Sequence, residues 1–392
     1  MRVQSDILTA MDNGRIVALI LLDLSSAFDT VHHSILLNQL KSIGVSGTAL
    51  QWFTSYLTDR SQSVCIDNEN STSELLQRGV PQGSVLGPIL FYIYIRPLGK
   101  IISKHNLHYH LYADDTQIYV SFNPSQSHAN NALHSLELCV EEIRNWMSQN
   151  FLKLNDDKTE FIVFGSKQQL DKVSIKHIRI GSSNISPSSH VRNLGIILDS
   201  NMTLSSHISS MCKSAYFHLR NIGLIRKYLT EQATQNLIHA FVTSRLDMGN
   251  SFLFGLPDTL LNRLKRLQNI AARVITRTKP SDSITPIFLK LHWLPVKHRI
   301  VFKILLFMYR CCRGIAPAYL TELLKLHQPN RPLRSSNKLL YTQSVVNRSW
   351  GRRSFLSAGP RLWNNLPEEI KLTTSLTQFK SNLKTHLMKN AF

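Results

Sequence analysis

The chain has few cysteines, little negative charge and no long apolar run. Its 392 residues include only five cysteines, Cys65, Cys139, Cys212, Cys311 and Cys312. This odd set without paired spacing argues against a disulfide scaffold and for a reducing compartment. The adjacent pair at 311 and 312 cannot chelate zinc in the usual C-x-x-C manner, so no zinc knuckle is expected.

The longest uncharged stretch runs from Gly79 to Ile95 and contains Pro81 and Pro88. It falls short of the roughly 18–20 apolar residues that a membrane-spanning helix needs. Charged residues also interrupt the first twelve positions, which excludes the apolar core of a signal peptide. We therefore expect a soluble, intracellular protein, nuclear or cytoplasmic, that is neither secreted nor attached to a membrane.

Charge is distributed unevenly along the chain. Residues 1–200 hold 16 Lys and Arg against 18 Asp and Glu, whereas residues 201–392 hold 29 against 7. So strong a surplus repels itself unless a polyanion neutralises it, and nucleic acid is the commonest such partner. The alternative is a basic surface that serves only solubility.

The first 200 residues alternate strand-like and helix-like segments. Val17–Leu22 (VALILL) is typical of a strand buried on both faces. The pattern further predicts helices ending near residue 42 and over 46–59, 86–103 and 123–150, a hairpin over 62–79, two strands within 108–121, and strands near 159–165, 173–180 and 194–198. After residue 200 it predicts helices over 204–227, 230–245, 257–276 and 296–313, an irregular stretch over 328–360, and short helices over 367–371 and 376–389.

Two acidic positions carry the candidate chemistry. Asp23 ends the buried aliphatic strand, and Asp114 and Asp115 occupy the turn between two strands. A carboxylate is costly to bury unless it is paired or holds a metal. Oxygen ligands at this density suit Mg²⁺ or Mn²⁺ rather than zinc, and two such ions bridged by carboxylates serve phosphoryl transfer. Taken singly, Asp23 also fits a helix cap or turn residue, and the Asp-Asp pair fits a solvated turn.

Five motifs, read together, resemble the palm of a reverse transcriptase. They are LLDLSSAFD (21–29), RGVPQGSVLGPILF (78–91), YADD (112–115), FLKLNDDKTE (151–160) and VRNLGIILD (191–199). Their order and spacing are most similar to those of polymerases of non-LTR (LINE-type) retrotransposons. The segments HWLPVKHRI (292–300), SAGPRLWNNLP (357–367) and FKSNLKTHL (379–387) resemble the C-terminal extension of one subgroup of these elements.

The resemblance implies a metal site built from three aspartates. Asp23 and Asp114 would be the main ligands of two Mg²⁺ ions, with Mn²⁺ as a substitute, and Asp115 the third acid of the triad. Lys158 would protonate the departing pyrophosphate, although a phosphate clamp or a solvated lysine fits this position equally.

Other motif positions imply contacts with substrates. Phe28 would lie under the sugar of the incoming nucleotide and exclude a ribose 2′-OH, Gln82 and Gly83 would contact that nucleotide, and Tyr112 would lie beside the primer end. The hairpin at Asn193, Leu194 and Gly195 would grip the primer strand. Basic residues of the following helices, among them Arg220, Arg226 and Lys227, would follow a phosphate backbone, or else form solvated helix faces.

The fold implied is α+β. A right-hand polymerase palm, an antiparallel sheet packed on helices, would cover residues 1–200, a basic helical thumb 201–285, and a C-terminal extension of unknown role 286–392. Only 22 residues precede Asp23, so the resemblance also implies an N-terminal truncation with the fingers largely missing.

The function implied is RNA-directed DNA polymerase (nucleotidyltransferase) of a transposable element. The chain would extend a DNA primer 3′-OH with dNTPs on an RNA template by a two-metal mechanism. One alternative is a truncated, catalytically inactive remnant that only binds nucleic acid. Another is a group II intron maturase or a telomerase-like relative, which the segments between 292 and 387 fit less well.

Overall fold

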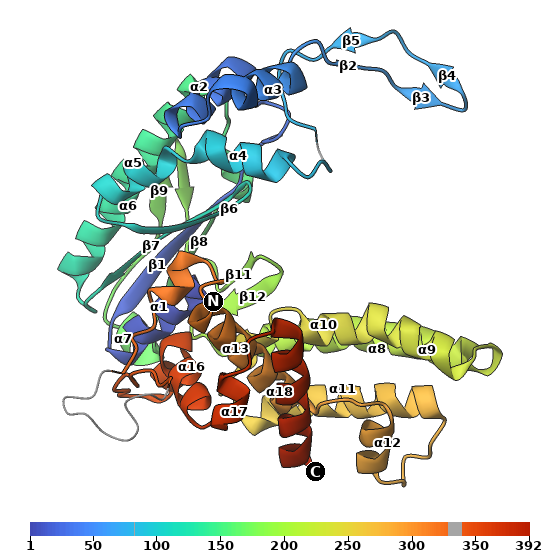
Figure 1. Cartoon of the computed structure of the whole chain (residues 1–392). Coiled ribbons are helices and arrows are strands. Elements are labelled where there is room, and N and C mark those ends of the chain that lie inside the picture. Colours follow the sequence, from blue (N-terminus) through green and yellow to red (C-terminus); the bar gives the residue numbers. More distant parts are fainter. Residues whose placement is uncertain (82, 328–338) are drawn as a thin grey trace. The chain divides into compact units, whose positions relative to one another are not determined.

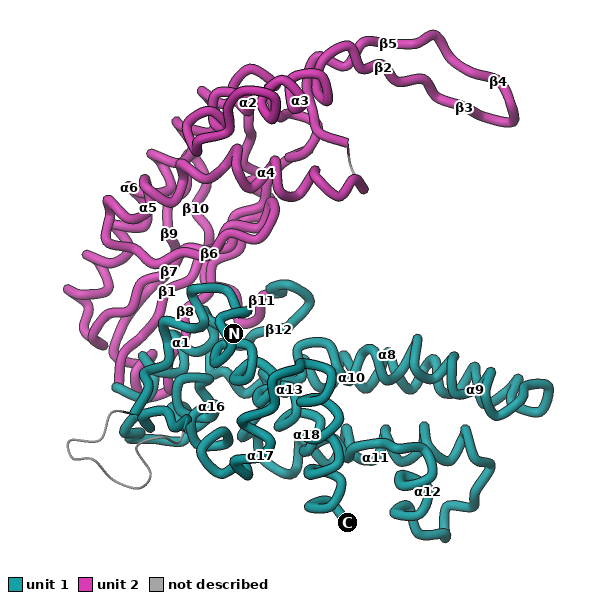
Figure 2. Tube along the Cα trace, viewed as in Figure 1, with its two compact units in different colours: residues 1–13, 192–392 teal, residues 14–191 magenta. Residues whose placement is uncertain are grey.

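The computed structural model describes residues 1–81, 83–327 and 339–392. The chain forms two compact units, coloured separately in Figure 2: residues 14–191, called here the sheet unit, and residues 1–13 with 192–392, called the helical unit. Helices and antiparallel strands are mixed in the first unit, and helices dominate the second (Figure 1). The expected mixture of helix and sheet is therefore confirmed, whereas the assignment of palm, thumb and extension stays a prediction.

A four-stranded antiparallel sheet forms the centre of the sheet unit, in the order β6–β7–β1–β8. These strands are β6 (His108–Tyr112), β7 (Asp115–Phe122), β1 (Ile16–Leu22) and β8 (Glu160–Phe164). Strand β1 lies inside the sheet and is buried on both faces, as its aliphatic run predicts. Alternate residues of β1, from Ile16 to Leu22, join one hydrophobic core with α4, α5 and α6.

The other elements of the sheet unit surround this sheet. Its helices are α2 (His33–Ser42), α3 (Gly47–Leu57), α4 (Gly87–Ile95), α5 (Leu98–Lys104), α6 (Gln126–Gln149), the 3-10 turn η1 (Asp156–Lys158) and α7 (Lys167–Leu170). Its short strand pairs are β2 (Ser61–Gln62) with β5 (Glu74–Leu75), β3 (Cys65–Ile66) with β4 (Glu69–Asn70), and β9 (Ile178–Ile180) with β10 (Ser183–Ile185). The hairpin from β2 to β5 extends beyond α3 in Figure 1.

Two predictions for this unit were too coarse. The helix expected over 86–103 is broken between α4 and α5 at Pro97, because proline has no N–H for the preceding turn. Of the strand expected over 173–180, only the last three residues pair, forming the β9–β10 hairpin.

The helical unit contains helices at the predicted positions and further helices that the pattern did not predict. Its elements are α1 (Arg2–Asp12), β12 (Ile196–Asp199), which pairs with β11 (His190–Asn193), α8 (Ser205–Ile225), η2 (Arg226–Tyr228), α9 (Glu231–Ile238), the π-type turn η3 (His239–Thr243), α10 (Ser244–Asp247), η4 (Asn250–Leu253), α11 (Asp258–Thr276), α12 (Ile284–Lys290), α13 (Val296–Cys312), α14 (Ala318–Thr321), α15 (Ser349–Arg353), α16 (Phe355–Asn364), α17 (Glu368–Lys371) and α18 (Leu376–Ala391). Helices α8 and α11 pack side by side (Figure 1).

The irregular stretch expected over 328–360 is wrong for its second half. Helices α15 and α16 occupy most of 349–364, and residues 328–338 lie outside the described part of the chain. Phe355, Ala358 and Trp363 are buried on one face of α16. Burial of this apolar stripe outweighs the low helix propensity of the small and polar residues around it. Within the described residues, no helix combines the length and apolar character that crossing a membrane requires.

Candidate active site

Strand pairing brings Asp23 and Asp115 to the same end of the central sheet. In the antiparallel ladder between β1 and β7, Leu22 is paired with Thr116. Asp23 directly follows Leu22, and Asp115 directly precedes Thr116, so this pairing places the two aspartates next to each other in register. The aliphatic run that buries β1 therefore fixes where the first carboxylate lies.

A tight hairpin adds the third carboxylate. Tyr112, the last residue of β6, is paired with Asp115 at the start of β7, which leaves only Ala113 and Asp114 in the turn. Ala113 has a positive φ of 50°, a conformation common in such two-residue turns. The predicted two strands around YADD are confirmed, whereas the expectation that both aspartates occupy the turn is wrong for Asp115, which begins β7.

The three carboxyl groups interact electrostatically. Burial raises the pKa of Asp115, and the neighbouring charges of Asp114 and then Asp23 raise it further. The Oδ2 atom of Asp23 is buried and makes no hydrogen bond within the described part of the chain. Partly buried carboxylates that repel one another and accept few hydrogen bonds favour the binding of a cation.

Lys158 supplies part of that positive charge. Its Nζ lies 3.4 Å from Asp23 Oδ2. The segment is held against β1, because the Asn155 N–H donates a 3.0 Å hydrogen bond to the Asp23 carbonyl and Glu160 is paired with Leu21. The Lys158 side chain is 69% exposed, so this ion pair is weak and readily exchanged.

The donor set fits a divalent oxygen-ligated ion such as Mg²⁺. Within the described ranges, no group of three or more His, Cys, Asp or Glu side chains is assembled as a complete ligand set. Magnesium does not require one, since it keeps several waters and uses one or two carboxylates together with substrate phosphates. The Asp23 oxygen that makes no hydrogen bond and the mutual repulsion at Asp115 are the features that such an ion would relieve.

The segment after Asp23 packs against the 78–91 motif. The Val80 N–H donates a 2.9 Å hydrogen bond to the Phe28 carbonyl, and the Phe28 ring lies 5.0 Å from the Phe91 ring of α4. Gly79 has a φ of 93°, and a Cβ there would meet the Asp29 carbonyl oxygen at 3.2 Å. Glycine at 79 thus permits the close approach that places the half-buried Phe28.

The remaining predicted substrate contacts of the sheet unit are only partly described. Gln82 lies outside the described residues. Gly83 has a φ of 78° with open space where a Cβ would be, and Ser84 Oγ closes the turn by donating a 2.7 Å hydrogen bond to the Pro81 carbonyl. Tyr112 is 59% exposed at the end of β6, beside the aspartates in the same hairpin.

The predicted primer contacts belong to the helical unit. Asn193 ends β11, and Leu194 and Gly195 form the turn to β12 with φ values of 46° and 82°. Leu194 is exposed there.

The three predicted backbone contacts on and after α8 differ in their surroundings. Arg220 and Lys227 are exposed. Arg226, in contrast, donates hydrogen bonds to the carbonyls of Val274 at 2.8 Å and Ile275 at 2.6 Å. Its guanidinium therefore caps the C-terminal end of α11, a role that helical spacing alone could not distinguish from a phosphate contact.

Comparison with known proteins identifies the family of the chain. The sequence profile of the family described as reverse transcriptase (RNA-dependent DNA polymerase) matches residues 2–198. A probable RNA-directed DNA polymerase from transposon BS of Drosophila melanogaster is 27% identical over 283 residues, which cover 70% of this chain and 30% of the relative. The RNA-directed DNA polymerase from mobile element jockey of the same fly is 26% identical over 215 residues, covering 54% and 22%.

Among solved structures, apo telomerase from Candida tropicalis is similar with a TM-score of 0.40 and 11% identity, covering 76% of this chain and 50% of that chain. The chain spans about a third or less of the length of these curated relatives. The resemblance to retrotransposon polymerases inferred from the five motifs is confirmed by the relatives. With half of its residues matched by the profile, the chain belongs to the reverse transcriptase family.

Proposed function

We propose that this chain catalyses RNA-directed DNA synthesis, extending a primer 3′-OH with deoxynucleotides on an RNA template. The observation that supports the proposal is the strand register that puts Asp23, Asp114 and Asp115 at the same end of the central sheet, where burial and the charges of the other two raise the pKa of Asp115. Two divalent ions held there would activate the primer hydroxyl and stabilise the leaving pyrophosphate.

The chain's own residues would orient the reactants. Asp23 and Asp114 would hold the ions, and Asp115 would tune their charge. Phe28 would support the sugar of the incoming nucleotide, with Gln82 and Gly83 beside it, and Tyr112 would border the primer end. Because Lys158 pairs with Asp23, cations bound to the carboxylates would release it to interact with the pyrophosphate.

The helical unit would hold the template and primer. Exposed Phe217, Leu224 and Tyr228 alternate with Arg220 and Lys227 on or just after α8. Apolar and cationic side chains in one row suit a nucleic-acid backbone without reading its sequence. Within this proposal residues 1–200 form the palm, 201–285 the thumb and 286–392 an extension, and the hairpin at 193–195 grips the primer.

The test is primer extension by the purified full chain with poly(rA), oligo(dT), dTTP and Mg²⁺. Extension that requires both the RNA template and the divalent ion is the expected result. Binding of the primer–template without extension, under conditions where a retroviral enzyme extends it, would instead identify a remnant that only binds nucleic acid.

Replacing Lys158 with glutamine should separate metal binding from proton transfer. Loss of a cation 3.4 Å from Asp23 should tighten Mn²⁺ binding by about two- to fivefold, the scale of an exposed ion pair. Turnover should fall by about 10²-fold or more, because a general acid contributes that much. Single-turnover kinetics measures the two effects, with a range of Mn²⁺ concentrations for metal binding and a range of pH for turnover. Lys153→Gln, an exposed lysine of the same segment, is the matched control, and unchanged turnover in Lys158→Gln would contradict the proton-transfer role.

Replacing Phe28 with valine should admit ribonucleotides. The smaller side chain opens space beside the sugar, and steric discrimination in such a pocket is worth roughly 10- to 200-fold. The ratio of kcat/KM for dTTP and UTP on poly(rA) measures the effect. Phe28→Tyr keeps the flat ring and should keep the selectivity. Equal selectivity in Phe28→Val and the parent would remove Phe28 from this role.

A further inference from the structure

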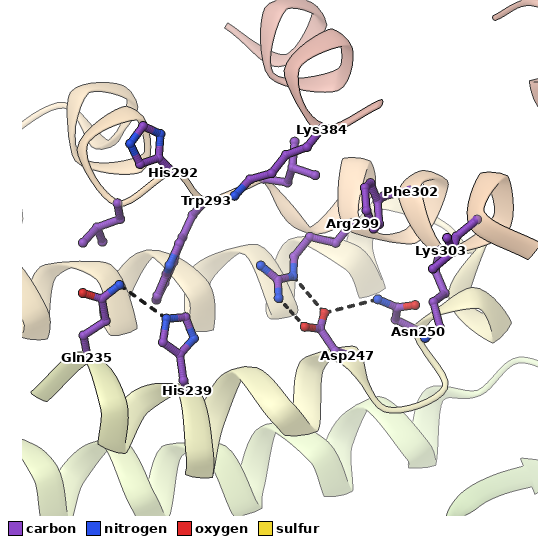
Figure 3. Close-up of a pocket in the computed structure, with 13 residues that line it drawn as sticks. Gln235, His239, Asp247, Asn250, His292, Trp293, Arg299, Phe302, Lys303 and Lys384 are labelled. Atoms are coloured by element: carbon purple, nitrogen blue, oxygen red, sulfur yellow. Dashed lines mark hydrogen bonds and ion pairs between the residues drawn. The ribbon is translucent and has the colours of Figure 1, made fainter. Parts of the chain in front are cut away.

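A cavity of about 490 Å³ opens within the helical unit. One wall comes from α9, η3 and α10, and the facing wall from the segment before α13, α13 itself and α18 (Figure 3). The π-type turn His239–Thr243 lies between α9 and α10, and turns of this kind are frequent at functional sites. The volume falls within the range of small-molecule sites.

One end of the cavity offers rings and neutral hydrogen-bonding groups. Trp293 is 4% exposed, and its ring centroid lies 5.7 Å from that of His239. Gln235 reaches the same imidazole, with its amide nitrogen 3.4 Å from His239 Nε2 (Figure 3). Burial and then the nearby Arg299 lower the pKa of His239, which favours the neutral ring. Such a group of flat and amide surfaces suits a planar heterocycle.

Cationic side chains line the rest of the cavity, from beside Trp293 to Lys303 (Figure 3). Arg299 forms a bidentate ion pair with Asp247, which uses the one acidic side chain lining the cavity. Lys303 and Lys384 also line it, and within the described residues neither ammonium has a hydrogen-bond or ion-pair partner; Lys303 lies 5.6 Å from the Phe307 ring. In Figure 3 Lys384 extends from α18 with its ammonium towards Trp293, and Lys303 lies beyond Arg299. The cavity thus carries a net positive charge, with Arg299 held rigid by its partner.

We propose that this cavity binds a nucleotide, with the base at the Gln235, His239 and Trp293 end and the phosphate between Lys303 and Lys384. A ligand with an anion at one end and a planar hydrogen-bonding ring at the other matches both halves of the site. A free nucleotide and one nucleotide of a single strand share this chemistry. The site lies in a different unit from the three aspartates and goes beyond the proposed polymerase reaction.

Adenosine 5′-monophosphate is the probe, titrated into the full chain without divalent metal and followed by calorimetry and tryptophan fluorescence. It should bind at least about tenfold more tightly than adenosine or inorganic phosphate alone, because each end of the site adds its own contacts. Lys303→Gln/Lys384→Gln should weaken binding by about tenfold or more, since two charge-assisted contacts are lost. Lys380→Gln, with the same charge change one helical turn away on α18, should leave it within about threefold of the parent.

Competition with a short single-stranded oligonucleotide identifies the source of the nucleotide. If the oligonucleotide displaces the monophosphate from the parent and no longer does so in the double variant, the natural ligand is a nucleotide of a strand. If it does not displace the monophosphate, the natural ligand is a free nucleotide. The proposal is overturned if inorganic phosphate competes as well as the monophosphate, if the double variant binds as the parent does, or if no binding occurs up to roughly 10 mM, a concentration that corresponds to negligible affinity.

Discussion

Asp114→Asn should abolish primer extension, reducing turnover by at least about a thousandfold, while the chain stays folded. Metal ions at phosphoryl-transfer sites supply several kcal/mol of transition-state stabilisation, and each 1.36 kcal/mol is tenfold in rate. Asparagine keeps the size of the side chain at the two-residue turn but removes the charge that the ions require. Extension of oligo(dT) on poly(rA) measures the loss.

Asp114→Asn should also have an effect on thermal stability that replacement of a merely structural residue would not have. Burial and the charges of Asp114 and Asp23 raise the pKa of Asp115. A carboxyl with a raised folded-state pKa binds its proton more firmly in the fold, so its stabilising contribution is lost as the pH rises, and its ionised form weakens the metal-free fold at neutral pH. Removing the charge of Asp114 relieves that repulsion. The metal-free Tm should therefore stay equal or rise slightly.

Divalent cations should stabilise the parent and the variant differently. An ion that binds the folded chain raises Tm by mass action, so Mn²⁺ should raise the Tm of the parent more than that of Asp114→Asn. Asp157→Asn is the matched control, because Asp157 is exposed and lies outside the three-carboxylate group. If Asp114→Asn lowers the Tm so far that unfolding accounts for the loss of activity, Asp114 maintains the fold and not the chemistry.

The sequence indicated the positions of Asp23 and of the YADD hairpin correctly because their determinants are local, whereas the metal site itself stays a prediction. A fully aliphatic strand is favoured in a buried position, and the register of that strand with the YADD hairpin places the three aspartates at the same end of the sheet. Each of these two signals, the aliphatic run and the YADD turn, lies within a short segment of the sequence. The hairpin turn at Ala113 and Asp114 needs only the two residues between paired strands.

The features that were missed depend on partners far away in the chain. Nothing near Arg226 shows that its guanidinium reaches the carbonyls of Val274 and Ile275. The cavity beside Trp293 likewise exists only where α9, α13 and α18 meet. The spacing of charges along one helix predicts which side chains share a face. Only the packing of the helices decides which of these cations bond to other parts of the protein.

Helix α1 illustrates this dependence most clearly. Asp12, at its last position, is 4% exposed. Its carboxylate accepts hydrogen bonds from the N–H groups of Asn347 at 2.7 Å, Arg348 at 2.7 Å and Gly351 at 2.9 Å. These donors lie at the start of α15, where backbone N–H groups have no partner within the helix. A negative charge at that position also interacts favourably with the helix dipole.

Replacing Asp12 with alanine should destabilise the helical unit by roughly 3–6 kcal/mol, because three donors would be left without their charged acceptor. Hydrogen exchange followed by mass spectrometry should show faster exchange in peptides covering 345–353, and urea unfolding should give an earlier transition. Asp12→Asn keeps one carbonyl acceptor and should lose about half as much.

Asp6→Ala removes the partly exposed partner of Arg2 on the same helix and provides the control, with an expected cost of about 1 kcal/mol or less. The two variants differ in where the lost acceptor lies and not in how much charge is removed from α1. Exchange at 345–353 that is equally fast in Asp6→Ala and Asp12→Ala would show that general loosening of α1, and not the three hydrogen bonds of Asp12, holds these distant segments together.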